Sequence, residues 1–115
     1  MDQRVYILDE ITVKPGVCQQ YQALYRDEYM PEARRRGMRL EGAWQHPPVE
    51  EFAGHATTLY YLWSVEDVPA WWAMRLSRSP DGTDERLAKL AWWQKNDALT
   101  ERRERKFLSA LPEAG

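Results

Sequence analysis

Hydrophobic and polar side chains alternate over residues 4–13, which predicts a β-strand with two different faces. One face is aliphatic apart from a single carboxylate, and it consists of Val5, Ile7, Asp9, Ile11 and Val13. The opposite face is mixed, and it consists of Tyr6, Leu8, Glu10 and Thr12. Because successive side chains of a strand point to opposite sides, only one of Asp9 and Glu10 can face a given cavity.

A turn at residues 15–16 separates this strand from a predicted helix. Apolar residues recur at helical spacing to about Arg36, and Gly37 is a suitable residue to end the helix. Pro31 is expected to kink the second half of the helix or to shorten it.

Two further strands are predicted in the middle of the chain. Alternation resumes over residues 38–45 and stops at residues 46–48, where a histidine precedes two prolines. Residues 57–63 are almost all β-branched, aromatic or aliphatic, which favours a third strand.

The C-terminal half predicts helices followed by one more strand. A helix carries Val68 to Leu76, residues 79–82 form a turn, and a further helix runs from a cap at Thr83 towards Leu99. The alternating charges of residues 101–106 are interpreted as a solvated face. The end of the chain, residues 106–112, favours a short fourth strand, with a continued helix as the alternative.

The element order is therefore β-α-β-β-α(α)-β, which predicts an α+β, ferredoxin-like fold with an antiparallel four-stranded sheet. Helices would cover one face of such a sheet. The other face would expose apolar and aromatic side chains, and a second copy of the same sheet is the simplest cover for them. We therefore expect a homodimer, arranged as a dimeric α+β barrel that encloses an aromatic-lined pocket.

Composition narrows the class of protein. The 115 residues suit a single domain spanning residues 1–115, and the net charge of −2, without a basic patch, argues against nucleic acid as a partner. No apolar run is long enough to span a membrane, and the single cysteine, Cys18, fits the cytoplasm. Neither metal-ligand spacing nor a glycine-rich phosphate loop occurs, so no cofactor is expected.

Three segments of the chain resemble the NIPSNAP family of the dimeric α+β barrel superfamily. They are residues 13–16 (VKPG), 40–44 (LEGAW) and 62–67 (LWSVED), and they occur in family order. The resemblance implies the ferredoxin-like fold. It says less about function, because the superfamily contains cofactor-free monooxygenases, isomerases, cyclases, haem enzymes and members without enzymatic activity.

The chain also departs from the family pattern at polar positions. Relatives often carry an arginine late in the first strand, where this chain has Asp9, and a histidine in the third strand, where it has Tyr61. An arginine expected near the start of the second helix is replaced by Trp71, whereas the next one is kept as Arg75. The resemblance therefore implies a rebuilt polar lining and a different ligand or reaction.

Four side chains are candidates for acid–base chemistry. Asp9 or Glu10, partly buried among aromatic residues, could transfer a proton, and the sequence leaves open which of them does so. His46, at a strand end, titrates near neutrality, and the Tyr61 hydroxyl could donate a hydrogen bond to an oxyanion. Their structural alternatives are an ion pair or a solvated edge for the carboxylates, a turn residue for His46, and a core or interface aromatic for Tyr61.

Five further side chains are candidates for substrate binding. Trp44 and Trp63 are expected to form the walls of a pocket for a flat ligand, and Tyr6 shares the face of Glu10. Arg75 lies four residues after Trp71, within reach of a cation–π contact or of an anionic ligand group.

Three functional hypotheses follow from these residues. The first is a cofactor-independent enzyme, an isomerase, lyase or cyclase, that acts on a hydrophobic cyclic or aromatic small molecule. The second is a non-catalytic binder of small molecules or an adaptor that docks proteins through Trp72 or Trp93. The third is a cofactor-free monooxygenase with a phenolic substrate.

Overall fold

The computed structural model describes residues 3–49, 55–76 and 85–111, without the side chains of residues 76 and 85–90. Its elements are β1 (Val5–Val13), α1 (Cys18–Leu24), a π-helical segment η1 (Tyr25–Tyr29), α2 (Met30–Arg35), β2 (Arg39–His46), β3 (Thr57–Val65), α3 (Val68–Leu76), α4 (Glu85–Leu99) and β4 (Thr100–Ser109). The βαββαβ order predicted from the sequence is present.

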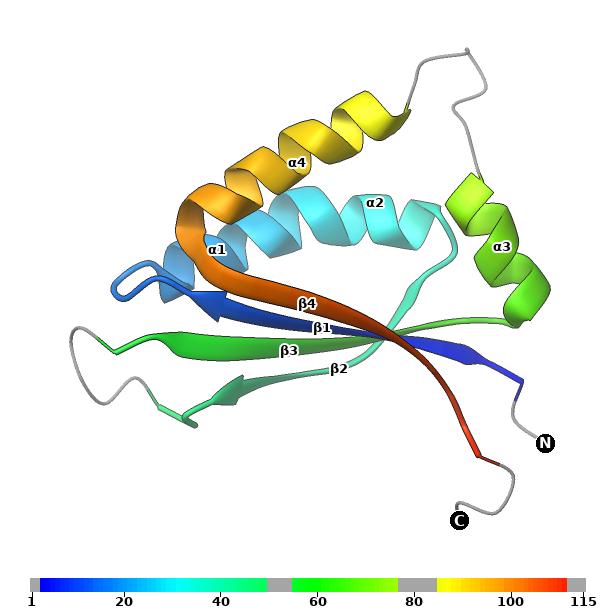
Figure 1. The fold of residues 1–115 in the computed structure, drawn as a ribbon, viewed down its shortest axis with the longest axis horizontal. Coiled ribbons are helices and arrows are strands. Elements are labelled where there is room, and N and C mark those ends of the chain that lie inside the picture. Colours follow the sequence, from blue (N-terminus) through cyan, green and yellow to red (C-terminus); the bar gives the residue numbers. More distant parts are fainter. Residues whose placement is uncertain (1–2, 50–54, 77–84, 112–115) are drawn as a thin grey trace.

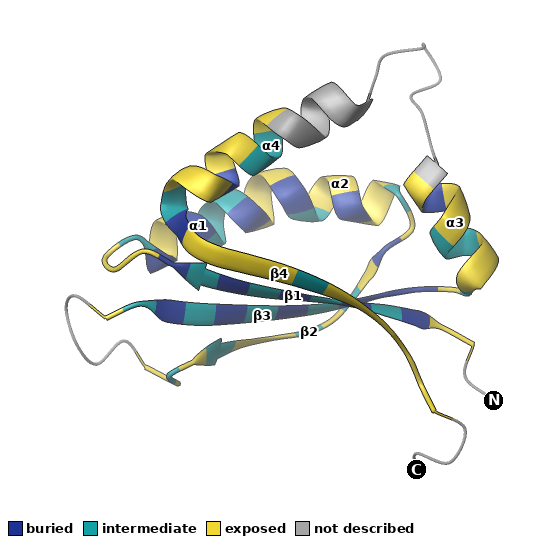
Figure 2. Ribbon diagram, in the orientation of Figure 1, coloured by how far each residue is buried: buried dark blue, intermediate teal, exposed yellow. Residues whose placement is uncertain are grey.

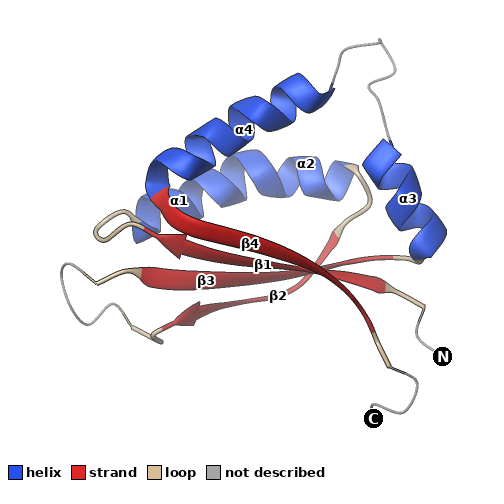
Figure 3. Cartoon of the chain, in the orientation of Figure 1, coloured by secondary structure: helices blue, strands red, loops and turns tan. Residues whose placement is uncertain are grey.

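The four strands form one antiparallel sheet in the order β2-β3-β1-β4. The helices lie on one side of this sheet, with α3 at one end of the helical layer (Figures 1 and 3). We call this side the helix face and the other side the open face. No helix of the described residues covers the open face (Figure 1).

The first helical region runs through a π-helical turn. Pro31 is the second residue of α2, and η1 covers the five residues before Met30. Proline has no N–H to donate, so the regular i→i+4 ladder of hydrogen bonds is interrupted here. Before α2 begins, the helix has the wider i→i+5 spacing of a π-helix, with the Met30 N–H donating to the Tyr25 carbonyl. Gly37 has a φ of 92°, and its N–H donates to the Arg34 carbonyl at 3.0 Å, which confirms the predicted helix end.

The fourth strand is longer than predicted and begins six residues earlier. It follows α4 directly, and its residues pair with the whole of β1, from Thr100 opposite Val13 to Ser109 opposite Val5. The hydrogen bonds of this ladder come from the backbone, so a charged sequence does not prevent them. Residues 101–104 and 106 are exposed, as the interpretation of this run as a solvated face predicted, and only Arg105 is partly buried.

The core lies between the sheet and the first helical region, where the dark blue segments of Figure 2 face each other. β1 and β3 each bury every second residue on the helix face, as the alternation in the sequence predicted. The fully buried aromatic and aliphatic side chains with the largest volumes are Trp63, Tyr21, Tyr25, Ile7 and Val13. Three of these five side chains are aromatic, and the core that they belong to also holds Asp9, the one carboxylate of its strand face.

Candidate functional site

The pairing of β1 brings three polar side chains together on the helix face. Asp9 lies directly opposite Tyr61 of β3 on one side and Arg105 of β4 on the other. The Asp9 residue is only 3% exposed, and Tyr61 is also buried. Of the sequence-predicted catalytic residues, the sheet register therefore places Asp9 and Tyr61 on the same face.

Asp9 is held by two donors. The Arg105 Nε donates to Oδ1 at 2.6 Å and its Nη2 donates to Oδ2 at 2.9 Å, which is a bidentate ion pair. The Tyr25 hydroxyl also donates to Oδ2 at 2.9 Å. A buried charge of this kind is tolerated only when it is paired and hydrogen-bonded, and Asp9 meets both conditions.

The hydrogen bonds continue into the aromatic core. The Trp63 Nε1 donates to the Tyr25 hydroxyl at 2.8 Å, and the Arg105 Nη2 also donates to the Tyr29 hydroxyl. We call Asp9, Arg105, Tyr25, Tyr29 and Trp63 the Asp9 network. It joins β1, β3 and β4 to η1, so the π-helical turn contributes two of its five members.

Aromatic rings enclose the Asp9 network. The Tyr61 ring stacks on the Tyr25 ring with 3.9 Å between centroids and 15° between planes. Trp92 of α4 lies 5.3 Å from the Tyr29 centroid. Because these rings exclude water, interactions between charges and dipoles inside the cluster are stronger than at the surface.

Burial and charge shift the pKa values of this cluster. Burial raises the pKa of Tyr25 well above its ordinary value, and the charge of Asp9 raises it further. Burial also raises the pKa of Tyr61, with smaller contributions from Cys18 and Asp9. For Arg105, burial lowers the pKa, but the hydrogen bond to Asp9 and its charge outweigh burial, so the pKa is raised. At neutral pH both phenols are therefore proton donors and Arg105 is a cation.

Two phenolic protons in this cluster have no acceptor among the described residues. The Tyr61 hydroxyl makes no hydrogen bond there, and the Tyr29 hydroxyl accepts from Arg105 but has nothing to which to donate. The buried Trp92 Nε1 likewise has no partner in the described part of the chain. These are the donors that a ligand oxygen could use.

The other predicted site residues on β1 and β2 lie on the open face. Glu10 approaches Lys106 at 3.7 Å, and Tyr6 shares the face of Glu10, as predicted. Trp44 pairs with Tyr60 and is 57% exposed, and His46 is exposed at the end of β2. The structure thus separates Glu10 and His46 from Asp9 and Tyr61 by the thickness of the sheet.

The expectation that Trp44 and Trp63 form the walls of one pocket was wrong. Trp63 is fully buried on the helix face, whereas Trp44 lies on the open face. A register shift between Leu40 and Gly42 places Leu40 opposite Trp63 but Gly42 opposite Leu62. Such an irregularity turns the remaining side chains of β2 over, and the residue pattern does not reveal it.

Trp71 and Arg75 form a separate group at the end of the helical layer. The Arg75 guanidinium carbon lies 5.2 Å from the Trp71 ring centroid and 5.2 Å from that of Phe107 on β4. The predicted cation–π contact between Arg75 and Trp71 is therefore present. Trp71 Nε1 is buried without a partner among the described residues.

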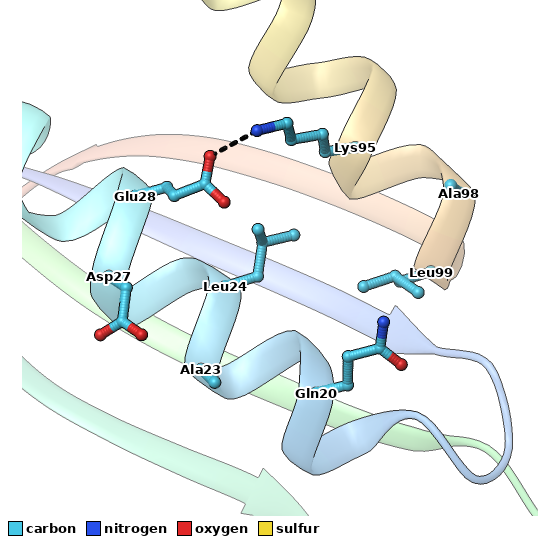
Figure 4. Close-up of a pocket in the computed structure, with 8 residues that line it drawn as sticks. All are labelled: Gln20, Ala23, Leu24, Asp27, Glu28, Lys95, Ala98 and Leu99. Atoms are coloured by element: carbon cyan, nitrogen blue, oxygen red, sulfur yellow. Dashed lines mark hydrogen bonds and ion pairs between the residues drawn. The ribbon is translucent and has the colours of Figure 1, made fainter.

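A shallow groove runs along the outer surface between the first helical region and α4 (Figure 4). Its lining residues are Gln20, Ala23, Leu24, Asp27, Glu28, Lys95, Ala98 and Leu99. The Lys95 Nζ and the Glu28 carboxylate form an ion pair of 2.7 Å across it. It contains none of the residues predicted to carry chemistry, so we do not regard it as the reaction site.

Sequence reasoning missed Arg105, Tyr25 and Tyr29. The tyrosines were recognised only as an apolar helical stripe, and Arg105 was assigned to a solvated charged run. An available signal was the alternation of Arg103, Arg105 and Phe107, which would share one face if the last strand began near residue 100. The carboxylate on the buried face of β1 then required a cation, and Arg105 was the one in register.

Within the described residues, no three histidine, cysteine, aspartate or glutamate side chains are placed to hold a metal ion. None of the described helices is both long and apolar enough to cross a membrane.

No protein-family model matches the chain, and no curated sequence matches it. Solved structures do match. An uncharacterized NIPSNAP domain protein from Burkholderia xenovorans has a TM-score of 0.60 and 19% identity, with 96% of this chain and 98% of that chain covered. A NIPSNAP family protein of unknown function from Agrobacterium tumefaciens has a TM-score of 0.63 and 16% identity, with 98% and 93% covered.

A more distant match is a variant of SnoaB, a cofactor-independent oxygenase from Streptomyces nogalater. Its TM-score is 0.54 at 17% identity, with 96% of this chain and 99% of that chain covered. The structural matches confirm the ferredoxin-like α+β fold and, at the level of the fold, the resemblance to NIPSNAP proteins. At these identities they do not transfer an activity.

Proposed function

We propose that this protein is a cofactor-independent enzyme that moves protons on a hydrophobic, cyclic or aromatic small molecule, in the manner of an isomerase, lyase or cyclase. The observation that carries the proposal is the fully paired Asp9 carboxylate inside an aromatic core, next to phenols with unused protons. Keeping a charge there costs stability, and buried ionisable groups with specific charge partners occur often at functional sites.

In the proposed reaction, Asp9 removes a proton from a carbon next to a carbonyl group. The electrons of that C–H bond move to the carbonyl oxygen, and the Tyr61 hydroxyl donates a hydrogen bond to the enolate that forms. Return of the proton at another carbon completes an isomerisation. Arg105 and Tyr25 hold the carboxylate in place, and the surrounding rings exclude water.

The site also argues against an adaptor. A non-catalytic adaptor predicts no buried ionisable group behind its docking residues, whereas Asp9 is 3% exposed. The adaptor would use Trp72 or Trp93. Trp72 is half-exposed on α3, whereas Trp93 is partly buried on α4, with the Arg105 guanidinium carbon 5.6 Å from its ring centroid.

A second candidate is oxygen chemistry on a phenolic substrate without a metal. The fold similarity to a cofactor-independent oxygenase favours it. It differs from the first candidate in a measurable way, because substrate loss must be coupled to oxygen consumption.

The proposal is tested by proton exchange at a carbon acid. The probe is 1-tetralone in D₂O, and the measurement is the loss of its α-proton signal by NMR. We expect the wild type to accelerate exchange and both Asp9→Asn and Tyr61→Phe to reduce the acceleration at least about 100-fold. Glu10→Gln, the neighbouring carboxylate on the open face, is the control and should retain it. Equal losses in all three variants, or none in Asp9→Asn, would refute this assignment.

We also propose that the protein works as a homodimer through the open face. This face carries Tyr6, Leu8, Tyr60 and Leu62. Among the described elements, no helix lies over this side of the sheet (Figure 2). The radius of gyration is 15.5 Å, compared with about 13 Å for a compact domain of this length. A chain that is this open on its own leaves apolar surface for a second copy to cover.

Native mass spectrometry tests the dimer. We expect the wild type to be dimeric, Leu62→Lys to shift the protein towards monomer, and Gln94→Lys, on the exposed side of α4, to remain dimeric. A wild type that is monomeric at all concentrations would overturn the proposal.

A further inference from the structure

The Tyr29 ring has two guanidinium groups beside it, and only one of them has a carboxylate partner. Arg105 Cζ lies 5.6 Å from the ring centroid, and Arg36 Cζ lies 6.0 Å from it. Arg105 is neutralised by Asp9 at 2.6 Å. Arg36 forms no ion pair with any described carboxylate, and the nearby Glu32 pairs with Arg35 instead.

The hydrogen-bonding state of Arg36 is also unusual. Its Nε is buried and has no partner among the described residues, as is true of Trp92 Nε1. The Trp92 ring lies 5.3 Å from Tyr29, whose own phenolic proton lacks an acceptor in the described part of the chain. A buried donor without a partner is rare in folded proteins and costs stability. Here two of them, Arg36 Nε and Trp92 Nε1, belong to side chains that lie beside the Tyr29 ring.

We propose that Arg36 binds a carboxylate on the substrate, which makes the substrate an aromatic or cyclic carboxylic acid. This inference rests on the proposed function, because it specifies the ligand of the same aromatic cluster. The side edge of a guanidinium, formed by Nε and one Nη, matches the two oxygens of a carboxylate. Tyr29 and Trp92 supply further donors beside it, and the rings accept the flat, apolar part of the molecule.

The chemistry of the surroundings favours a carboxylate over a phosphate. A phosphate site usually combines several cations or a row of backbone N–H groups. Here one guanidinium without an ion pair to a described carboxylate, that of Arg36, lies over the Tyr29 ring, with donors for a planar group with one negative charge.

The experiment compares two probes of nearly equal shape, 1-naphthoate and the neutral 1-naphthamide, by quenching of tryptophan fluorescence. We expect the wild type to bind naphthoate at least about tenfold more tightly than naphthamide. Arg36→Gln should reduce that ratio to below about threefold, chiefly by weakening the binding of naphthoate. Arg34→Gln removes the same charge from an exposed position on α2 and should keep the wild-type ratio.

The outcomes separate this inference from the proposed function. If naphthoate and naphthamide bind with equal affinity, the carboxylate site is refuted while the aromatic site remains. A preference for naphthoate that persists in Arg36→Gln, or is lost equally in Arg34→Gln, also refutes it. If neither probe binds to a folded wild type, both the inference and the proposed aromatic site fail. Arg36→Lys, which keeps the charge but not the planar fork, should retain only part of the preference.

Discussion

Asp9 and Glu10 are neighbours in β1, yet the two faces of the sheet treat these carboxylates differently. On the helix face, Asp9 is buried and receives hydrogen bonds from Arg105 and Tyr25. On the open face, the Glu10 side chain is 28% exposed and has one cation, Lys106, at 3.7 Å. Adjacent residues of the same chemical class therefore have different physical roles.

The comparison shows that the energetically costly carboxylate, the buried one, lies on the helix face. A paired but buried charge adds little net stability over an apolar core of the same shape, so stability alone does not explain it. Within a single copy of the chain, the polar contacts of the open face are those of a partly exposed sheet surface, where an ion pair contributes little to stability. A functional group is therefore better sought on the helix face, and the two faces should respond to equivalent substitutions by different amounts.

Removal of the cation from each carboxylate gives the largest expected difference. Arg105→Gln leaves Asp9 buried without its ion pair, and we expect the free energy of unfolding to fall by about 3 kcal/mol. Lys106→Gln removes the equivalent cation on the open face and should cost less than about 1 kcal/mol. Urea denaturation at one fixed protein concentration measures both. Similar losses for the two variants would show that the faces do not differ as the geometry indicates.

Removal of one phenolic oxygen from each face gives the next largest difference. Tyr25→Phe deprives the Asp9 Oδ2 of a donor and the Trp63 Nε1 of its acceptor. Because both groups stay buried, we expect a loss of about 2 kcal/mol. Tyr60→Phe on the open face removes a hydroxyl with no hydrogen bond to the described residues and should cost less than about 0.5 kcal/mol. If Tyr25→Phe did not lower the free energy of unfolding, water would have to reach the Asp9 network and replace the lost hydroxyl.

Alkaline pH should weaken the helix face. The pKa values of Tyr21, Tyr25 and Tyr61 are raised, chiefly by burial, so the unfolded chain loses these protons at a lower pH than the folded one. Their stabilising contribution is complete below about pH 10. It falls as the pH rises further, by up to about 1.4 kcal/mol per pH unit for each tyrosine. Tyr61→Phe removes one of these groups and should make the decline less steep.

Denaturation series at pH 9, 10 and 11 measure this slope. An equal slope in the wild type and in Tyr61→Phe would contradict the assignment of Tyr61 to the buried cluster.

The sequence predicted the fold because its periodicity is strong where the fold is determined. β1 and β3 alternate so regularly that the two faces of each strand, with Asp9 and Glu10 on opposite ones, followed from spacing alone. That Tyr61 shares the face of Asp9 depends on the register between the two strands. The helix end at Gly37 was also local information, because only a glycine readily adopts the positive φ found there.

What the sequence did not predict depends on contacts between distant segments. The partner of Asp9 lies 96 residues away, in a strand whose charged residues resemble a solvated surface. The position of Trp44 depends on an irregularity in the pairing of β2 with β3. Both are properties of strand register, which a local pattern of residue types does not contain.

The smallest change in the free energy of unfolding is expected from the loss of a hydrogen bond between two side chains of the open face. The hydroxyls of Thr12 and Thr58 lie 2.9 Å apart on neighbouring strands. Thr58→Val keeps the branched shape but leaves Thr12 without this partner, so we expect a loss of about 0.5 kcal/mol in urea denaturation. The double variant, in which Thr12→Val is added, should recover most of that loss, because no polar group is then left unpaired. No such double variant can be made for Asp9 on the helix face. Asp9 accepts hydrogen bonds from both Arg105 and Tyr25, so removing one partner together with Asp9 would still leave the other unpaired. A loss above about 2 kcal/mol for Thr58→Val would mean that the open face is as dry and as tightly constrained as the helix face, and the search for a reaction site would have to include it.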